Sequence, residues 1–300
     1  MAFKTLRPVQ VTDAVLVSST VPENDHPPWQ AGQDYAQFAR VIRGHRIYES
    51  GMAGVSNTPP EQDPQRWVDV DPTNRWRMFD AAQLVRTRAP HSAQYVFKPG
   101  QAINGLIVLD TVAVESVRVR MQDPVAGLVY DKTVTSQPTA APTWFNWLYG
   151  PYESAEVWKL REDLPGYPNA TLTVDFTGGA GMELGPILFG DVREWGLGVK
   201  VGARLSITDY SLNEVNEFGR RKYVKRGWAS GGAFDLVLDN SALDDLYRHI
   251  VQLREAPAVL VPSERWTSTI FYGRMRCEVL IAYPDYSDVS ITIEGLVNND

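Results

Sequence analysis

The sequence predicts a mainly β protein with one amphipathic helix. Its 300 residues include 20 prolines, 23 glycines, 9 Trp, 13 Tyr and 10 Phe, a composition that favours turn-rich β structure. Several segments alternate apolar and polar residues at period two, and one segment has a helical period. We therefore expect a small aromatic β module, an antiparallel β-sandwich, and a C-terminal α+β module with a single amphipathic helix. The predicted boundaries are 1–72, 73–186 and 187–300.

The first segment, residues 1–72, is predicted to be a small module that depends on aromatic packing. A proline-rich stretch at 22–28 precedes four widely spaced aromatic residues: Trp29, Tyr35, Tyr48 and Trp67. Exposed Trp and Tyr rings suit glycan binding, because a ring stacks on the apolar C–H face of a sugar. The alternative is that the rings only form the core of the module. We expect Trp29 and Tyr48 to be the exposed pair, and Tyr35 and Trp67 to be core residues.

The second segment contains runs typical of strands at 103–109, 114–120, 128–135 and 171–176, separated by turn signals. Its densest aromatic run, at 144–152, contains Trp144 and Trp147. Three interpretations of this run stay open: a glycan-binding platform, a subunit interface, or a loop that packs under the sandwich.

The third segment combines strand-like runs with the one convincing helical pattern. Apolar residues recur at helical spacing after residue 242: Leu243, Leu246, Tyr247, Ile250 and Leu253. Ser241 and Asp244 resemble the start of a capping box. We predict a helix that begins near Ser241 and packs its apolar face against a sheet.

Composition excludes several classes of function. The net charge of −7 argues against duplex nucleic acid as a partner, because phosphate neutralisation needs a basic surface. No apolar run is long enough to cross a bilayer, so we expect no membrane insertion. The N-terminus lacks the features of a secretory signal, so we expect the protein to be made in a cytoplasm. With Cys277 as the only cysteine and four scattered histidines, we expect no disulfide, no metal site built from cysteine or histidine, and no cofactor. Carboxylates such as Asp69 and Asp71 leave a structural calcium ion open, although solvated acidic residues are the more common case.

The sequence favours a non-enzymatic protein. A nucleophile elbow, a P-loop and a His-Glu-x-x-His motif are all missing from the sequence. A pair of carboxylates placed for glycoside cleavage remains the alternative, but no spacing singles out such a pair.

The first segment resembles the small carbohydrate-binding modules of families 5 and 12. The resemblance lies in the order of Trp29, Tyr35, Val41, Tyr48, Pro60 and Trp67. The sequence has Ala39-Arg40 where those modules have a glycine before the valine. The resemblance implies glycan binding by Trp29 and Tyr48.

The run Asn74-Arg-Trp-Arg-Met-Phe-Asp80 is similar to one in tail and baseplate proteins of tailed bacteriophages. There, a small aromatic module leads through this run into a galactose-binding-like jelly roll. We interpret the run as a module junction in which Trp76 and Phe79 pack into both neighbouring cores. The junction residues are Asn74, Arg75, Trp76, Phe79 and Asp80.

This resemblance implies a structural protein of the virion tail, made in the cytoplasm of the host bacterium. The expected partners are further copies of the chain, as a trimer or hexamer, and other tail proteins, with a host-surface glycan as an additional contact. The alternatives are a soluble glycan-binding protein that uses Trp29, Tyr48, Trp144 and Trp147, and a glycan-degrading enzyme.

Overall fold

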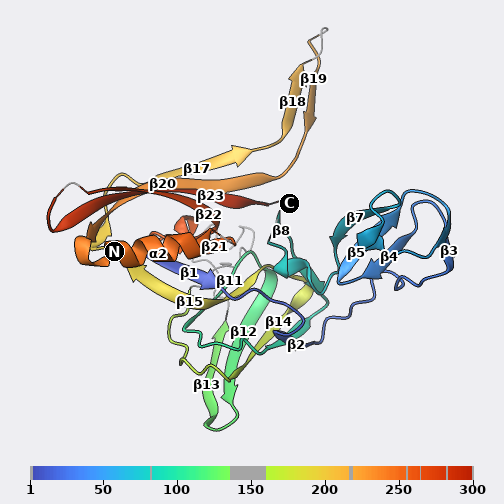
Figure 1. The fold of residues 1–300 in the computed structure, drawn as a ribbon, viewed down its shortest axis with the longest axis horizontal. Helices are drawn as coiled ribbons and strands as arrows, with labels where there is room; N and C mark the ends of the chain where they lie inside the picture. The colour runs from blue at the N-terminus through green and yellow to red at the C-terminus, as the bar shows by residue number, and fades with distance from the viewer. Residues whose placement is uncertain are drawn as a thin grey trace, which may run out of the picture.

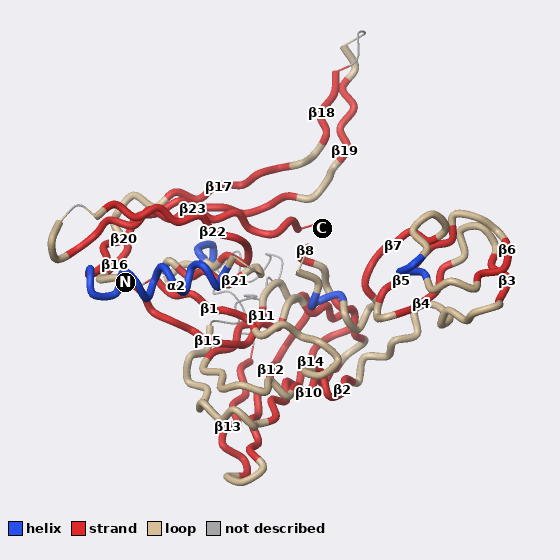
Figure 2. The backbone as a smooth tube through the Cα atoms, viewed as in Figure 1, coloured by secondary structure: helices blue, strands red, loops and turns tan. Residues whose placement is uncertain are grey.

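The computed structural model describes residues 3–81, 83–135, 160–215, 219–254, 256–263, 265–281 and 283–298. As predicted, this part of the chain is mainly β, with antiparallel sheets and one α-helix near its C-terminal end (Figures 1 and 2). Trp144 and Trp147 lie outside the described residues.

The largest sheet has ten strands among the described residues and takes them from all three predicted segments. Its first strand in the chain, β1, lies between β15 and β21 and is antiparallel to both. The order along the main path is β11 (Gly105–Val108), β15 (Ile187–Trp195), β1 (Phe3–Pro8), β21 (Ala258–Val261), β22 (Phe271–Leu280), β23 (Tyr286–Asn298), β20 (Trp228–Asp239) and β16 (Gly198–Val199). Two further strands join it: β17 (Arg204–Asp209) pairs with β20, and β8 (Gln83–Leu84) is parallel to β23.

A second sheet, of six described strands, faces the β11–β15 edge of the large sheet. Its main order is β13 (Gly127–Thr135), β12 (Val112–Asp123), β14 (Thr171–Leu184), β10 (Ser92–Phe97) and β2 (Leu16–Ser19), and β9 (Thr87–Ala89) pairs with β14. Alternate residues of β10 and β14 are buried, among them Tyr95, Phe97, Val174 and Phe176. From the facing strand β15, Phe189 packs on Phe97 with ring centroids 4.9 Å apart. The period-two pattern therefore produces a two-layered core.

The large sheet curls around helix α2 (Leu243–Leu253) (Figure 1). One apolar cluster joins Phe3 of β1 and Trp195 of β15 to Leu236 of β20 and Ile291 of β23. Leu246 of the helix belongs to the same cluster, so strands far apart in the sheet order meet across the helix. The helix is the amphipathic one that the sequence predicts.

Two details of this helix differ from the prediction. The capping side chain is Asp239 and not Ser241. The Asp239 carboxylate accepts a hydrogen bond from the Ser241 backbone N at 2.8 Å, at the start of a short 3-10 turn, Asn240–Ala242, that precedes α2. Tyr247 is exposed, and His249 is buried instead. The 3-10 turn alters the direction in which the helix starts, which a uniform helical period cannot anticipate.

The small module forms a separate body beside the second sheet (Figure 1). It contains a three-stranded sheet of β4 (Arg40–Arg43), β5 (Arg46–Ser50) and β7 (Trp67–Pro72), and a two-stranded sheet of β3 (Gln33–Tyr35) and β6 (Gly54–Ser56). Tyr35, Val41 and Trp67 are its buried core, with Trp29 and Tyr48 half-buried against them. Tyr35 and Trp67 are core residues, as predicted.

Candidate functional site

Residues 204–228, which we call the arm, extend the large sheet into solvent (Figures 1 and 2). Strand β17 pairs with the first half of β20, and the ribbon continues as β18 (Leu212–Val215) and β19 (Arg221–Val224). All residues of β17 and β19 are exposed on both faces. Because a strand normally buries at least one face, the arm is unusual in that no described part of the chain covers either of its faces.

The arm presents large apolar side chains to solvent. Ile207 is 74% exposed and Tyr223 is 63% exposed. The other exposed large apolar residues of the arm are Leu205, Tyr210, Val215, Val224 and Trp228. Single exposed apolar residues are ordinary, but a set of them on one thin ribbon indicates an interaction surface.

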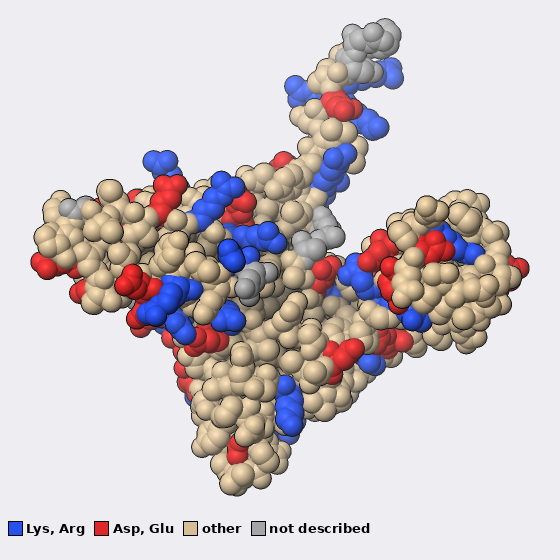
Figure 3. Space-filling model, in the orientation of Figure 1, with Lys and Arg blue, Asp and Glu red and all other residues tan. Residues whose placement is uncertain are grey.

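The arm is also basic within an acidic chain (Figure 3). Its sequence holds six Lys and Arg against three Asp and Glu, a net charge of +3, whereas the whole chain carries −7. Five of these cations fall within seven residues: Arg220, Arg221, Lys222, Lys225 and Arg226. No ion pair with a described residue is formed by Arg221, Lys222, Lys225 or Arg226.

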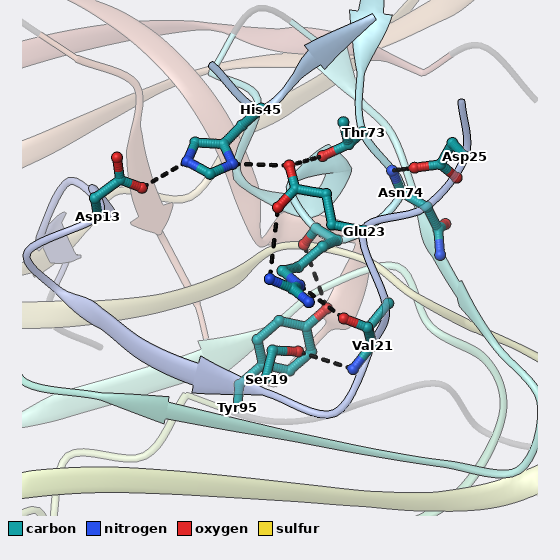
Figure 4. Close-up of polar contacts among 10 residues, drawn as sticks. Asp13, Ser19, Val21, Glu23, Asp25, His45, Thr73, Asn74 and Tyr95 are labelled. Atoms are coloured by element: carbon teal, nitrogen blue, oxygen red, sulfur yellow. Dashed lines mark hydrogen bonds and ion pairs between the residues drawn. The ribbon is translucent and has the colours of Figure 1, made fainter. Parts of the chain in front are cut away.

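A second candidate is the junction where the chain enters and leaves the small module (Figure 4). The entering segment and the leaving segment are tied directly to each other. Arg75 donates from Nε to the Val21 carbonyl at 2.7 Å, and the Asn74 backbone N donates to Asp25 at 2.9 Å. These bonds hold two segments that are about fifty residues apart in sequence against each other.

Glu23 is the centre of the junction. Its side chain is only 15% exposed and accepts a hydrogen bond from the Thr73 hydroxyl at 2.8 Å. Arg75 lies 3.5 Å from its other oxygen, and His45 Nδ1 lies 2.7 Å from the first. A largely buried carboxylate needs such partners, because burial without them is costly.

His45 connects the small module to this network through an uncommon backbone conformation. Gly44 and His45, in the β4–β5 turn, have φ values of +55° and +64°. Such two-residue turns favour Asn and Gly, and a histidine at positive φ carries a backbone cost of about 1–2 kcal/mol. Its side-chain contacts offset that cost.

Both ring nitrogens of His45 face carboxylates. Nδ1 lies 2.7 Å from Glu23, and Nε2 lies 2.7 Å from Asp13 in the loop after β1 (Figure 4). An imidazolium donates from both nitrogens, whereas a neutral ring has a single N–H. The two carboxylates therefore hold the ring from both sides.

Aromatic rings continue from His45 into the core of the sandwich. Trp76 stacks on His45 with centroids 4.3 Å apart, and Phe79 meets Trp76 edge-on at 5.9 Å. Phe79 also contacts Tyr95 and Phe97 edge-on, at 5.8 and 5.9 Å. Phe79 thus packs on the sandwich core as expected, whereas Trp76 rests on the β4–β5 turn and not on the Tyr35 and Trp67 core.

Asn74 and Asp80 complete the predicted junction set. The Asn74 side-chain amide donates to the Arg88 carbonyl and accepts from the Arg88 backbone N, both at 2.8 Å, so it pairs with β9 as a strand would. The Thr87 hydroxyl donates to the Asn74 carbonyl at 2.7 Å. The Asp80 backbone N donates to the Arg77 carbonyl and ends the 3-10 helix Arg77–Phe79. The structure brings all five predicted junction residues into one region.

The glycan-binding candidates of the small module are only partly open. The Arg43 guanidinium lies over the Trp29 ring, 4.8 Å from its centroid, and is held there by an ion pair with Glu61. Trp29 Nε1 donates to Ser56 at 3.3 Å. Burial, followed by the charges of Asp69 and Glu61, raises the pKa of Tyr48 above its usual value. A sugar would have to displace Arg43 to stack on Trp29.

A polar groove of about 430 Å³ lies between the small module and β9. Its charged lining is largely paired: Arg77 with Asp71, and Arg88 with Glu183. Phe, Tyr and Trp are missing from its described lining. Because most of its charged groups already have partners, the groove offers a small polar ligand fewer hydrogen-bonding groups than an open polar surface would.

Groups associated with catalysis are sparse in what the structure describes. Among the described residues, no cluster of three or more His, Cys, Asp or Glu side chains is placed to hold a metal ion. Burial raises the pKa of the Cys277 thiol to about 11, which leaves it protonated at neutral pH. No helix within the described ranges is both long and apolar enough to span a membrane.

Sequence reasoning missed His45, Glu23, Asp13 and the arm. A signal for the arm was present in the five cations of 220–226, which follow a strand-like run. The His45 contacts give no such signal, because Asp13 and Glu23 lie more than twenty residues away along the chain.

Comparison of the chain with models of protein families, with curated proteins and with solved structures found no match.

Proposed function

We propose that the chain is a non-enzymatic structural subunit of a bacteriophage tail or baseplate, which assembles in the virion with copies of itself and with other tail proteins. The observation that carries this proposal is the arm, a basic ribbon with apolar side chains exposed on both faces. A two-stranded ribbon is marginally stable in water by itself, so a partner that covers it gains apolar contact area and orders it. The resemblance of Asn74–Asp80 to tail and baseplate proteins supplies the biological setting.

The junction supports the same proposal in a different way. A tail subunit must hold its peripheral module in a defined position under mechanical load. The chain passes between the sandwich and the small module twice. The small module is also held against the sandwich by the Glu23 contacts and by the series of packed rings from His45 to Phe97.

The mass of the purified chain in solution tests the assembly part of the proposal. Light scattering across a range of concentrations should give a discrete oligomer, with a trimer or hexamer expected, and electron microscopy of the same sample should show a compact closed particle. Co-sedimentation with phage particles from a lysate should place the chain in the virion. A chain that stays monomeric at high concentration and never sediments with particles would contradict the proposal.

A shortened arm provides the matched control. The Tyr210 backbone N donates to the Gly227 carbonyl at 3.1 Å, so these two residues already face each other across the ribbon. Replacing residues 211–226 by Asn-Gly closes the ribbon with a two-residue turn and keeps β17 and β20 paired. We expect this variant to fold and to lose assembly.

A second candidate is glycan binding by the small module, which the half-exposed rings of Trp29 and Tyr48 favour. Trp29→Ala and Tyr48→Ala should each weaken retention on the recognised polysaccharide about tenfold, the value of one stacked ring. Arg43→Ala should strengthen retention, because it uncovers the Trp29 ring. Tyr223→Ala, on the arm, is the control and should bind normally. Unchanged retention in all variants would exclude these rings as the binding surface.

A further inference from the structure

The two ends of the large sheet carry opposite charge. The arm leaves one end of β20, and the other end of β20 leads into the start of α2 (Figure 1). Strand β20 has twelve residues, Trp228–Asp239, which corresponds to about 40 Å of extended chain. The two ends therefore belong to one sheet and lie far apart within one copy of the protein.

The end opposite the arm gathers exposed carboxylates and exposed apolar side chains, and we call it the acidic end. It consists of Asp239, Asp244, Asp245, Leu280, Ile281, Tyr283, Asp285 and Tyr286. These residues lie together because Asp239 pairs with Tyr286 across β20 and β23, and Asn240 donates to the carbonyls of Tyr283 and Asp285.

The acidic end also exposes large apolar side chains to solvent. Leu280 is 64% exposed and Ile281 is 66% exposed, next to each other at the end of β22. Tyr283 and Tyr286 stack with centroids 4.4 Å apart and are exposed. Tyrosine pairs of this kind are common at the centre of protein interfaces.

The charge of the acidic end is available to a partner. The Ser241 contacts lower the pKa of Asp239, so its carboxylate is ionised at neutral pH. Asp245 pairs with Arg248 of its own helix, whereas Asp244 and Asp285 form no ion pair with described residues. Within the described part of the chain, two of the four carboxylates thus face solvent without a counter-charge, and a third, Asp239, accepts its hydrogen bond from Ser241.

The arm has the matching features. A hollow of about 380 Å³ near its tip is lined by Glu214, Val215 and residues 220–222, which combine an apolar side chain with three cations. Without the arm, the rest of the chain carries a net charge of −10. An acidic surface with tyrosine and leucine side chains is therefore complementary to the arm in both charge and polarity.

We propose that the arm of one copy binds the acidic end of a second copy. This inference rests on the proposed function and names the surfaces through which the subunits would assemble. The contact is head-to-tail, because the two surfaces differ and lie at opposite ends of the sheet. Repetition of such a contact produces a closed ring or an open filament. Because the contact pairs exposed charges, it weakens as salt increases.

Charge reversal on each surface tests the pairing. The arm variant is Arg221→Glu with Lys225→Glu, and the end variant is Asp244→Lys with Asp285→Lys. All four side chains are exposed, so both variants should fold, which circular dichroism and the melting temperature check. Each variant alone should associate about 100-fold more weakly than the wild type in 50 mM NaCl, as expected when like charges are juxtaposed.

An equimolar mixture of the two variants is the decisive measurement. The reversed arm then meets a reversed end, and the unchanged arm meets an unchanged end, so light scattering should show an assembly that contains both chains. Raising NaCl to 0.5 M should dissociate the wild-type assembly.

Three results would overturn the inference. The first is an arm variant that assembles like the wild type, the second is a mixture that stays monomeric, and the third is a wild type that is monomeric and yet sediments with phage particles. The third result leaves the proposed function in place, whereas failure to join particles under every condition contradicts the function itself. Retention of duplex DNA by the wild type but not by the arm variant, with masses unchanged, would assign the arm to nucleic acid.

Discussion

Acidification should destabilise the protein through His249, which is 1% exposed and lies on the inner face of α2. Trp195 Nε1 donates to the Thr5 hydroxyl at 3.0 Å, and that hydroxyl lies 2.9 Å from His249 Nε2. The hydroxyl can therefore donate to a neutral imidazole. His249 Nδ1 has no hydrogen-bond partner among the described residues, so a proton added to the ring would place a buried charge without compensation.

The size of the effect follows from the shift in pKa. Burial, reinforced by the charge of Arg193 and Arg7 and opposed by Asp191, lowers the pKa of His249 from 6.5 to about 4. Below pH 6.5 the unfolded chain binds a proton that the folded chain does not, so the free energy of unfolding falls as the pH falls. The loss from this residue reaches about 2 kcal/mol at pH 5 and about 3 kcal/mol near pH 4.

The assay compares urea unfolding of the wild type and of His249→Gln at pH 7 and pH 5. Glutamine does not titrate and keeps an acceptor for Thr5. The wild type should lose about 2 kcal/mol more than the variant over this range, since the two proteins share every other ionisable group. An NMR titration of the His249 ring provides a second readout on the wild type alone. An equal pH dependence in the two proteins, or a ring that titrates near pH 6.5, would refute the reasoning.

Three further predictions concern the junction and the thiol. Phe79→Ala should lower the free energy of unfolding by about 2–3 kcal/mol, because the ring bridges Trp76 and the sandwich core, and chemical denaturation measures this loss. His45→Asn should keep the turn, since Asn tolerates positive φ, but should speed protease cleavage at residues 20–28, measured by limited proteolysis; unchanged cleavage would show that the ring does not hold the junction. Cys277 should react with iodoacetamide at pH 8 at least tenfold more slowly than a free thiol, because its pKa is raised to about 11, and denaturation should remove the difference.

Local patterns predicted the secondary structure and missed the pairing. The period-two runs and the 243–253 helix follow from which residues bury one face, and the structure confirms them. The position of β1 between β15 and β21 depends on partners more than 180 residues away, and no local pattern specifies such partners.

At the junction, too, local sequence identified some residues, whereas contacts between distant segments could not be predicted. Trp76 and Phe79 were singled out because they lie in the Asn74–Asp80 run, whose resemblance to tail and baseplate proteins implies a module junction. His45 was not found, because its role depends on a turn that places it between Asp13 and Glu23. Charge contacts between distant segments arise only once the fold exists.

Because β1 lies inside the large sheet, the sheet around it can be completed only late in synthesis on the ribosome. Residues 3–8 are synthesised well before the strands on both sides of them, which end at residues 195 and 261. At about 5–20 residues per second, β1 waits roughly 10–50 s for its second neighbour. During that time β15 can pair with β11 on one side and β1 on the other, whereas the edge of β1 that receives β21 stays open and depends on chaperones or on rapid completion of the chain.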